Sequence, residues 1–224
     1  VHAAGVVISP VPLIDIVPLQ YDTKGEGKLI TQFDMHAVDE DNVGLLKFDF
    51  LGIRNLAILA DAVKRVKKIY DIDVPIENIP LDDKKTFEML ARGETEGLFQ
   101  LNGSGMTKFL VELKPTTIHD INAMVALYRP GPIEMIPEYI ARKHDPSKIR
   151  FLDPRMESIL DRSHGVITYQ DDVMLIAIQL AGFTWIEADK LRKAMGKKIP
   201  ALMEEQRTKL SEGLIKNGMS QAKA

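Results

Sequence analysis

The alternation of hydrophobic and polar residues changes at about residue 55. Before that point, short apolar runs with a period of two are separated by proline and glycine, which is typical of strands and turns. These runs cover 4–9, 15–19, 28–33 and 44–51. Beyond Asn55, apolar residues recur every three or four positions, which predicts amphipathic helices. The expected fold class is α+β, with a small β-rich part followed by a mainly α-helical part.

Start and stop signals set the expected bounds of the helices. The first should follow Asn55 as its cap, with one apolar face made of Leu56, Leu59, Val63, Val66 and Tyr70. Thr184-Trp185-Ile186-Glu187 is a capping box, and its helix should end at Met195 with Gly196 beyond it. The other helices are expected over 83–90, 105–113, 118–127, a short stretch from Pro154, 174–181 and 200–216.

Composition narrows the class of protein. With 224 residues, 45% hydrophobic and 27% charged, the chain has a globular composition and can bury a core. It contains no cysteine, which excludes disulfides, thiol catalysis and thiolate metal sites. A formal net charge of −3 means that any nucleic-acid site must be a local basic patch. The longest apolar stretch, 173–183, is too short to span a bilayer, so no membrane partner is expected and a cytoplasmic location fits.

The chain begins at Val1 without an initiator methionine, in sequence that is typical of the middle of a domain. It ends at Ala224, where a further helix could begin. We therefore expect it to be an excised part of a longer protein.

Lys47 and Asp49 are the first candidates for chemistry. In a strand over 44–51 they project from one face, while alternate apolar residues form the other. A carboxylate held on a rigid strand suits a Mg²⁺ ion, and a neighbouring lysine suits a phosphate. The simpler interpretation is an edge strand with a solvated face. One carboxylate cannot hold two metal ions, so the metal hypothesis requires further ligands.

A basic cluster is the second candidate. Residues 190–198 contain no acid and carry five cations: Lys190, Arg192, Lys193, Lys197 and Lys198. Cations near a helix C-terminus can simply complement the helix dipole. That explanation suits two or three of them better than all five. A turn at Met195-Gly196 would let the others converge on phosphates, so nucleotide or nucleic-acid binding is the alternative.

The sequence Tyr169-Gln170-Asp171-Asp172 is similar to the metal-binding hairpin of reverse transcriptases. That hairpin needs a returning strand, whereas the apolar run 174–181, followed by Gly182, predicts a helix. Asp171 and Asp172 then fit the first helical turn, where carboxylates favour the positive end of the dipole.

Two further features were weighed. Arg129 lies in a rigid Pro-Gly-Pro turn just past a helix end, and the ordinary explanation is that the turn stops the helix. The histidines show no metal-ligand spacing and are expected to be structural or on the surface: His2, His36, His119, His144 and His164.

Six segments follow one another along essentially the whole chain: HAAGVVI (2–8), KFDFLG (47–52), GLFQL (97–101), ALYRPGP (126–132), GVITYQ (165–170) and LRKAMGKK (191–198). Together they resemble the alpha subunits of bacterial DNA polymerase III, the C family of replicative DNA polymerases. The resemblance implies that residues 1–54 are the C-terminal part of a palm of the polymerase-beta-like nucleotidyltransferase type. It implies that residues 55–224 are the N-terminal part of the fingers, truncated at the C-terminus.

The resemblance also implies roles for single residues. Asp49 matches the third of three aspartates that bind two Mg²⁺ ions, the other two of which are expected in an Asp-x-Asp motif upstream of this chain. Lys47 matches a lysine that points at the nucleotide phosphates. Arg192 and Lys193 match an Arg-Arg pair on the triphosphate, with Lys193 departing from the pattern and less able to bind in a fork. Further nucleotide-binding residues are expected at Lys197, Lys198, Arg129 and Gln170. Asn102 and Asp171-Asp172 also depart from the family pattern.

The implied activity is that of a DNA-directed DNA polymerase. Its partners would be primer-template DNA and dNTP, and in the complete enzyme a sliding clamp, a clamp loader and a proofreading subunit. Asp49 alone should bind Mg²⁺ weakly, so this fragment, expected to be a monomer, should not polymerise DNA by itself. Two alternatives stay open: a nucleotide- or DNA-binding helical module, and a structural segment without independent binding.

Overall fold

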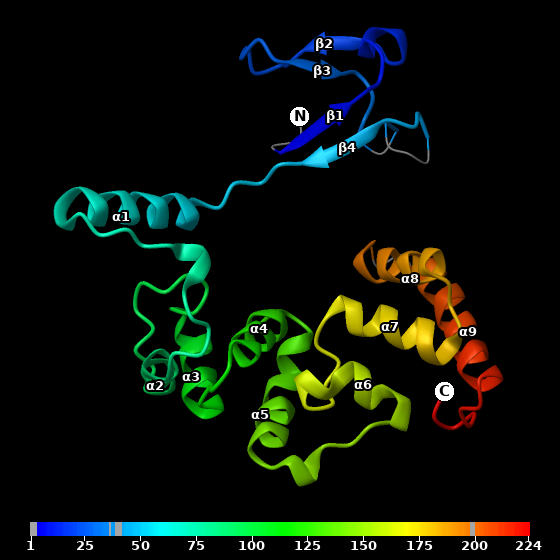
Figure 1. Cartoon of the computed structure of the whole chain (residues 1–224). Coiled ribbons are helices and arrows are strands. Elements are labelled where there is room, and N and C mark those ends of the chain that lie inside the picture. The colour runs from blue at the N-terminus through cyan, green and yellow to red at the C-terminus, as the bar shows by residue number, and fades with distance from the viewer. Residues whose placement is uncertain (1–3, 36, 39–41, 198–199) are drawn as a thin grey trace. The chain divides into compact units, whose positions relative to one another are not determined.

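The computed structural model describes residues 4–35, 37–38, 42–197 and 200–224, without the side chain of Lys197 (Figure 1). The chain divides into two compact units, Val1–Pro75 and Ile76–Ala224. The first carries the described strands and one long helix, and the second is helical. This order confirms the α+β class expected from the sequence.

Two small antiparallel sheets form in the first unit. Strand β1 (Gly5–Ile8) pairs with β4 (Leu46–Asp49), and β2 (Leu19–Tyr21) pairs with β3 (Leu29–Thr31). Burial alternates along β1, and apolar and polar residues alternate along β4, as expected for strands with one solvated face. The buried apolar side chains that the structure describes in this unit are Val17, Val38 and Leu45.

The strand expected over 15–19 is wrong. Leu13–Asp15 forms a short 3₁₀ turn instead, and β2 begins only at Leu19. The backbone N–H of Val17 donates to the Leu13 carbonyl at 2.8 Å, which closes the turn and buries the Val17 side chain.

Helix α1 (Arg54–Tyr70) has the predicted length and a different beginning. Its N-cap is Ile53, and no side chain caps it, so Asn55 lies inside the helix and not at the cap. No residue of α1 is buried. Of the expected apolar face, Val63 and Val66 are half-buried, while Leu56 is 61% exposed. The amphipathic pattern therefore predicted the helix correctly, but the apolar face of the helix is not buried.

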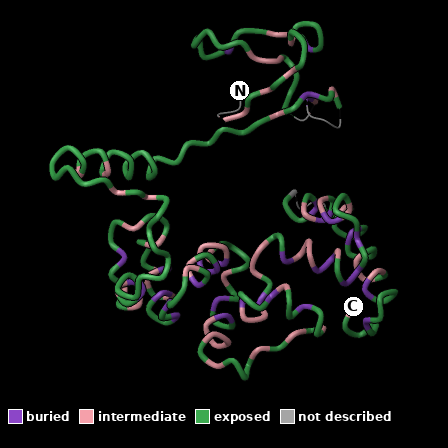
Figure 2. Tube along the Cα trace, viewed as in Figure 1, coloured by how far each residue is buried: buried purple, intermediate pink, exposed green. Residues whose placement is uncertain are grey.

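The second unit contains helices around two apolar cores: α2 (Lys84–Ala91), α3 (Ser104–Leu113), α4 (Ile118–Leu127), α5 (Ile136–His144), α6 (Glu157–Leu160), α7 (Gln170–Ala181), α8 (Trp185–Lys197) and α9 (Pro200–Lys216). One core lies among α3, α4 and α5 and includes Leu110, Met124 and Tyr139. The other lies among α6 to α9 and includes Leu180 and Leu214. Figure 2 shows buried positions recurring along these helices.

Two boundaries in the second unit differ from the prediction. Helix α5 was not among the predicted helices; Pro137 lies in its first turn, where a missing backbone N–H costs nothing. Helix α8 continues through Gly196 to Lys197, so the turn expected at Met195-Gly196 is absent from this described stretch. A helical glycine costs stability but does not have to end a helix.

Candidate functional site

Strand β4 places Lys47 and Asp49 two residues apart. Asp49 lies opposite Gly5 on β1, which has no side chain to cover the carboxylate, and Lys47 lies opposite Val7. The Lys47 ammonium donates to the Met35 carbonyl at 2.8 Å, so it links the strand to the preceding loop. Asp49 is exposed at the end of the strand. The expected strand, with Lys47 and Asp49 two residues apart on it, is confirmed.

The opposite face of this sheet is apolar and exposed. Val6, Ile8, Leu46 and Phe48 are each between 42% and 47% exposed. The rings of Phe48 and Phe50 stack at 6.2 Å between centroids. The apolar face expected from the alternation is therefore present and contributes little to the core of this unit.

The basic cluster on α8 has an acidic partner. The Arg192 guanidinium donates through Nε and Nη2 to Asp189 Oδ1 at 2.9 and 2.7 Å, and Lys193 Nζ lies 3.2 Å from Asp189 Oδ2. The hydrogen bond from Arg192 lowers the pKa of Asp189 below its usual range. Asp189 directly precedes the acid-free stretch 190–198. Both cations are partly exposed, and both are partly neutralised by it.

The remaining members of the cluster are less defined. Lys190 lies on α8 and is exposed, and Lys197 ends the helix. The side chain of Lys197 and all of Lys198 lie outside the described residues. The convergence of all five cations therefore stays a prediction.

Helix α7 settles the interpretation of Asp171 and Asp172. Both lie in its first turn, and Asp172 Oδ2 accepts hydrogen bonds from the backbone N–H groups of Thr168 and Tyr169 at 2.8 Å each. The helix ends at Gly182 with φ of 75°. The helix-start interpretation is confirmed, and the hairpin of reverse transcriptases is not formed here. Gln170 is the first residue of α7 and is exposed.

Arg129 opens onto a groove of about 380 Å³ in the second unit. Phe99, Gln100 and Leu101 line one side, and residues of α4 line the other. The structure thus brings together the segments 97–101 and 126–132. Gly131, with φ of 101°, allows the Pro-Gly-Pro turn to fold back, and the Ile133 N–H donates to the Arg129 carbonyl at 3.1 Å.

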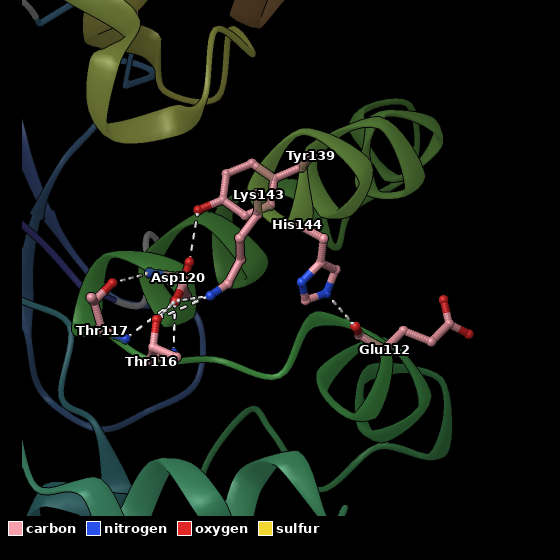
Figure 3. A network of polar contacts seen from close by, with 7 residues as sticks. All are labelled: Glu112, Thr116, Thr117, Asp120, Tyr139, Lys143 and His144. Atoms are coloured by element: carbon pink, nitrogen blue, oxygen red, sulfur yellow. Dashed lines mark hydrogen bonds and ion pairs between the residues drawn. The ribbon is translucent and has the colours of Figure 1, made fainter. Parts of the chain in front are cut away.

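A buried ion pair joins α4 and α5 (Figure 3). Lys143 Nζ lies 3.0 Å from Asp120 Oδ2, and the side chains are only 10% and 4% exposed. Asp120 also accepts from the Thr116 N–H at 2.9 Å and from the Tyr139 hydroxyl at 3.3 Å. Burial favours a neutral Asp120, but the Thr116 hydrogen bond and the Lys143 charge outweigh it and lower the pKa of this carboxyl.

Sequence analysis missed this network. A local signal for part of it exists, because Thr117-x-x-Asp120 is a capping box at the start of α4. No local signal predicts that Lys143 and Tyr139 of α5 meet Asp120. The burial that places Tyr139 beside Asp120 also raises the pKa of the Tyr139 hydroxyl far above its usual range.

Arg142 of α5 holds the segment that leads into α7. Its Nη1 donates to the carbonyls of Gly165 at 2.9 Å and Arg150 at 3.3 Å, while Nε donates to Glu138 at 2.7 Å. Gly165 has φ of 77°, and a Cβ there would approach Arg142 Nη1 to 2.9 Å. The glycine therefore permits both the left-handed backbone and the close approach of the arginine.

The histidines that the structure describes fit structural roles. The His164 ring meets the Tyr139 ring edge-on at 5.1 Å, and burial lowers the pKa of this histidine. The His144 ring contacts the Glu112 carbonyl at 2.9 Å. His2 and His36 lie outside the described residues. Among the described residues, no three His, Cys, Asp or Glu side chains are grouped to hold a metal ion, and no helix is long and apolar enough to cross a membrane.

Comparison with known proteins gives matches along nearly the whole chain. Residues 1–52 match the family model "Bacterial DNA polymerase III alpha NTPase domain", and residues 55–218 match "Bacterial DNA polymerase III alpha subunit finger domain". The DNA polymerase III subunit alpha of Staphylococcus aureus (strain COL) is 48% identical over 217 residues, which are 97% of this chain and 20% of that protein. The protein of the same name from Staphylococcus epidermidis is 46% identical over the same extent. The chain therefore spans about a fifth of the length of the curated relatives it matches.

Proposed function

The chain belongs to the bacterial DNA polymerase III alpha subunit family, and from that membership we propose that it is the part of a DNA-directed DNA polymerase where the palm ends and the fingers begin. The observation that carries the proposal is 48% identity over 97% of the chain. Residues 1–54 would be the C-terminal part of the palm, and residues 55–224 the N-terminal part of the fingers. The proposed reaction is template-directed addition of dNTP to a primer 3′-hydroxyl.

Asp49 is proposed to bind catalytic Mg²⁺. Its carboxylate is an oxygen ligand of the kind that Mg²⁺ prefers, and it is exposed on a hydrogen-bonded strand opposite a glycine. Because one carboxylate cannot hold two metal ions, Asp49 is proposed as one ligand of a metal pair. Bound Mg²⁺ supplies charge neutralisation in phosphoryl transfer.

The cations of α8 are proposed to bind the triphosphate of the incoming nucleotide. Arg192 offers a planar fork suited to phosphate oxygens, and Lys193 adds a point charge next to it. Asp189 holds both side chains at one place on the helix, which reduces the rotamer entropy lost on binding. Lys197, Lys198, Arg129 and Gln170 are proposed as further nucleotide contacts, and Lys47 as a phosphate-facing residue of the palm.

One observation favours a second candidate function. Arg192 and Lys193 both pair with Asp189 in the same helix, as cations with a purely structural role would do. In that case the second unit is a structural segment, and its cations stabilise α8. A third possibility lies between the polymerase segment and the structural segment: a helical module that binds nucleotide or DNA without catalysis.

Substituting Asp49 in the full-length polymerase tests the proposed function. Asp49→Asn keeps the size of the side chain and removes its charge, so primer extension should fall by several orders of magnitude while affinity for primed DNA changes little. Asp15→Asn, on the 3₁₀ turn of the same unit, is the matched control and should leave extension intact. Normal extension by the Asp49→Asn enzyme would exclude the metal role.

The complete enzyme is proposed to act in the cytoplasm on primer-template DNA. Sliding clamp, clamp loader and proofreading subunit are proposed as its partners. The 224-residue chain is proposed to be a monomer that does not extend primers by itself.

A further inference from the structure

The groove beside Arg129 combines features that the proposed palm and fingers roles do not explain. Its volume of about 380 Å³ lies near the lower end of the range of small-molecule sites, about 300–1,000 Å³. It lies within the second unit and joins two segments that are distant in the sequence. We propose that this groove binds one nucleotide of a single-stranded nucleic acid, its base against Phe99 and its phosphodiester at Arg129.

An exposed aromatic ring provides the surface for the base. Phe99 is 51% exposed although it is a large apolar residue, and it lines the groove beside half-buried Leu101. Single-stranded nucleic acids are commonly bound by stacking bases on such rings, because every base has a π-face. The carboxamides of Gln100 and Asn122 also line the groove and offer donors and acceptors to base edges.

The backbone next to Phe99 is unusual. Gln100 has φ of 62°, a left-handed conformation that a residue with a Cβ rarely adopts, and Gly97 has φ of 75°. The turn is closed by the Asn102 N–H, which donates to the Leu98 carbonyl at 3.2 Å. Such disfavoured conformations are concentrated at ligand sites, where the chain holds a side chain in a required position. Here the turn keeps Phe99 at the groove.

The charge of the groove selects the kind of phosphate. Among the described residues that line it, Arg129 is the only charged one. One guanidinium matches the single negative charge of a phosphodiester, whereas a triphosphate requires several cations. The inference therefore rests on the proposed function and changes one part of it: Arg129, named above as a contact of the incoming nucleotide, is assigned instead to a nucleic-acid strand.

The test compares two probes on the 224-residue chain by fluorescence anisotropy at low salt. One probe is a short labelled oligodeoxynucleotide, and the other is an abasic oligonucleotide of the same length, which keeps the phosphates and lacks the bases. Phe99→Ala should weaken binding of the normal oligonucleotide by about fivefold or more and leave the abasic one unchanged. Arg129→Ala should weaken both and reduce the slope of log affinity against log salt by about 0.7.

Matched controls are available in the same unit. Leu152→Ala removes an apolar side chain as exposed as Phe99, and Arg207→Ala removes an exposed arginine of α9. Neither substitution should change the affinity for one oligonucleotide more than the affinity for the other. If Phe99→Ala lowers the melting temperature, Phe99→Leu keeps the apolar volume, removes the π-face and should still weaken the normal oligonucleotide selectively.

Several outcomes would overturn the inference. They are no binding of the normal oligonucleotide by the wild-type chain, equal loss of both probes in Phe99→Ala, or no loss of either. If Phe99→Ala weakens binding of neither probe, an apolar peptide becomes the ligand that fits the groove. Failure of the proposed function is a separate result, because it is read from primer extension by the Asp49→Asn full-length enzyme and not from oligonucleotide binding.

Discussion

A single carboxylate, Asp189, changes the interpretation of the basic cluster on α8. Without it, Arg192 and Lys193 would be two unpaired cations that repel each other on one helix. With it, both are held by hydrogen bonds and ion pairs of 2.7 to 3.2 Å. The pairs are partly exposed, so each contributes little to stability, typically about 0.3–0.5 kcal/mol. Their larger effect is to fix where a phosphate would find two positive charges.

Substitutions at Arg192 and Lys193 of the full-length polymerase separate binding from helix stabilisation. If Arg192 binds the triphosphate as proposed, Arg192→Ala removes charge-assisted hydrogen bonds to it, and KM for dNTP should rise about tenfold in steady-state primer extension. Lys193→Arg restores a fork and should keep or improve nucleotide affinity. Arg207→Ala on α9 is the control. An unchanged KM, with a loss of stability of about 0.3–1 kcal/mol, would instead assign the cations to the helix dipole.

At the level of elements, a local capping signal correctly predicted where α8 begins. The Thr184 hydroxyl accepts from the Glu187 N–H at 3.3 Å, and Glu187 Oε2 accepts from the Thr184 N–H at 2.7 Å, so the predicted capping box of α8 is confirmed. Glu187 also pairs with Lys209 of α9 at 2.6 Å. One carboxylate therefore both starts α8 and joins it to the next helix.

This double role makes the link between α8 and α9 dependent on pH. The hydrogen bond from Lys209, followed by those from Thr184, lowers the pKa of Glu187 from 4.5 to about 2. Because the pKa is lower in the folded state, the stabilisation is complete above pH 4.5 and is lost as the pH falls toward about 2. The urea midpoint of Glu187→Gln should therefore lie below that of the wild type at neutral pH, and the difference should shrink on acidification. Glu204→Gln alters an exposed carboxylate that pairs with Arg207 within α9, and it should show little of this effect. A difference that does not change with pH would contradict the assignment.

On the scale of the whole molecule, the two units differ in how much core they hold. Val17, Val38 and Leu45 are the buried apolar residues described in Val1–Pro75, and the other buried apolar residues that the structure describes lie in Ile76–Ala224. Helix α1 and the outer face of β1 and β4 remain exposed. A segment of this size with so few buried side chains is at the margin of independent stability.

Separate expression of the two units should show this difference. Residues 76–224 alone should be helical and melt cooperatively by circular dichroism at 222 nm, because both helical cores lie within them. Residues 1–75 alone should show no cooperative transition. A cooperative melt of residues 1–75, or an unfolded fragment 76–224, would contradict the conclusion that only the second unit is stable by itself.

The sequence by itself determined the fold class, the bounds of α4 and α9, the capping box of α8 and the placing of Lys47 and Asp49 on one strand. These features depend on residues within a few positions of one another, and periodicity and capping chemistry report them directly. The sequence analysis did not predict α5, and its prediction that α8 ends before Gly196 was wrong, because Gly196 is helical.

Only the tertiary structure decided which distant residues meet. The Asp120–Lys143 pair, the Arg142 contacts to Gly165 and Arg150, and the groove between 97–101 and α4 all join separate segments. Nothing in the local pattern specifies such contacts, because they follow from how apolar helix faces pack and from the need to pair polar groups that packing buries. Local sequence thus placed the individual side chains on their helices and strands, and the packing of those helices brought the polar groups together.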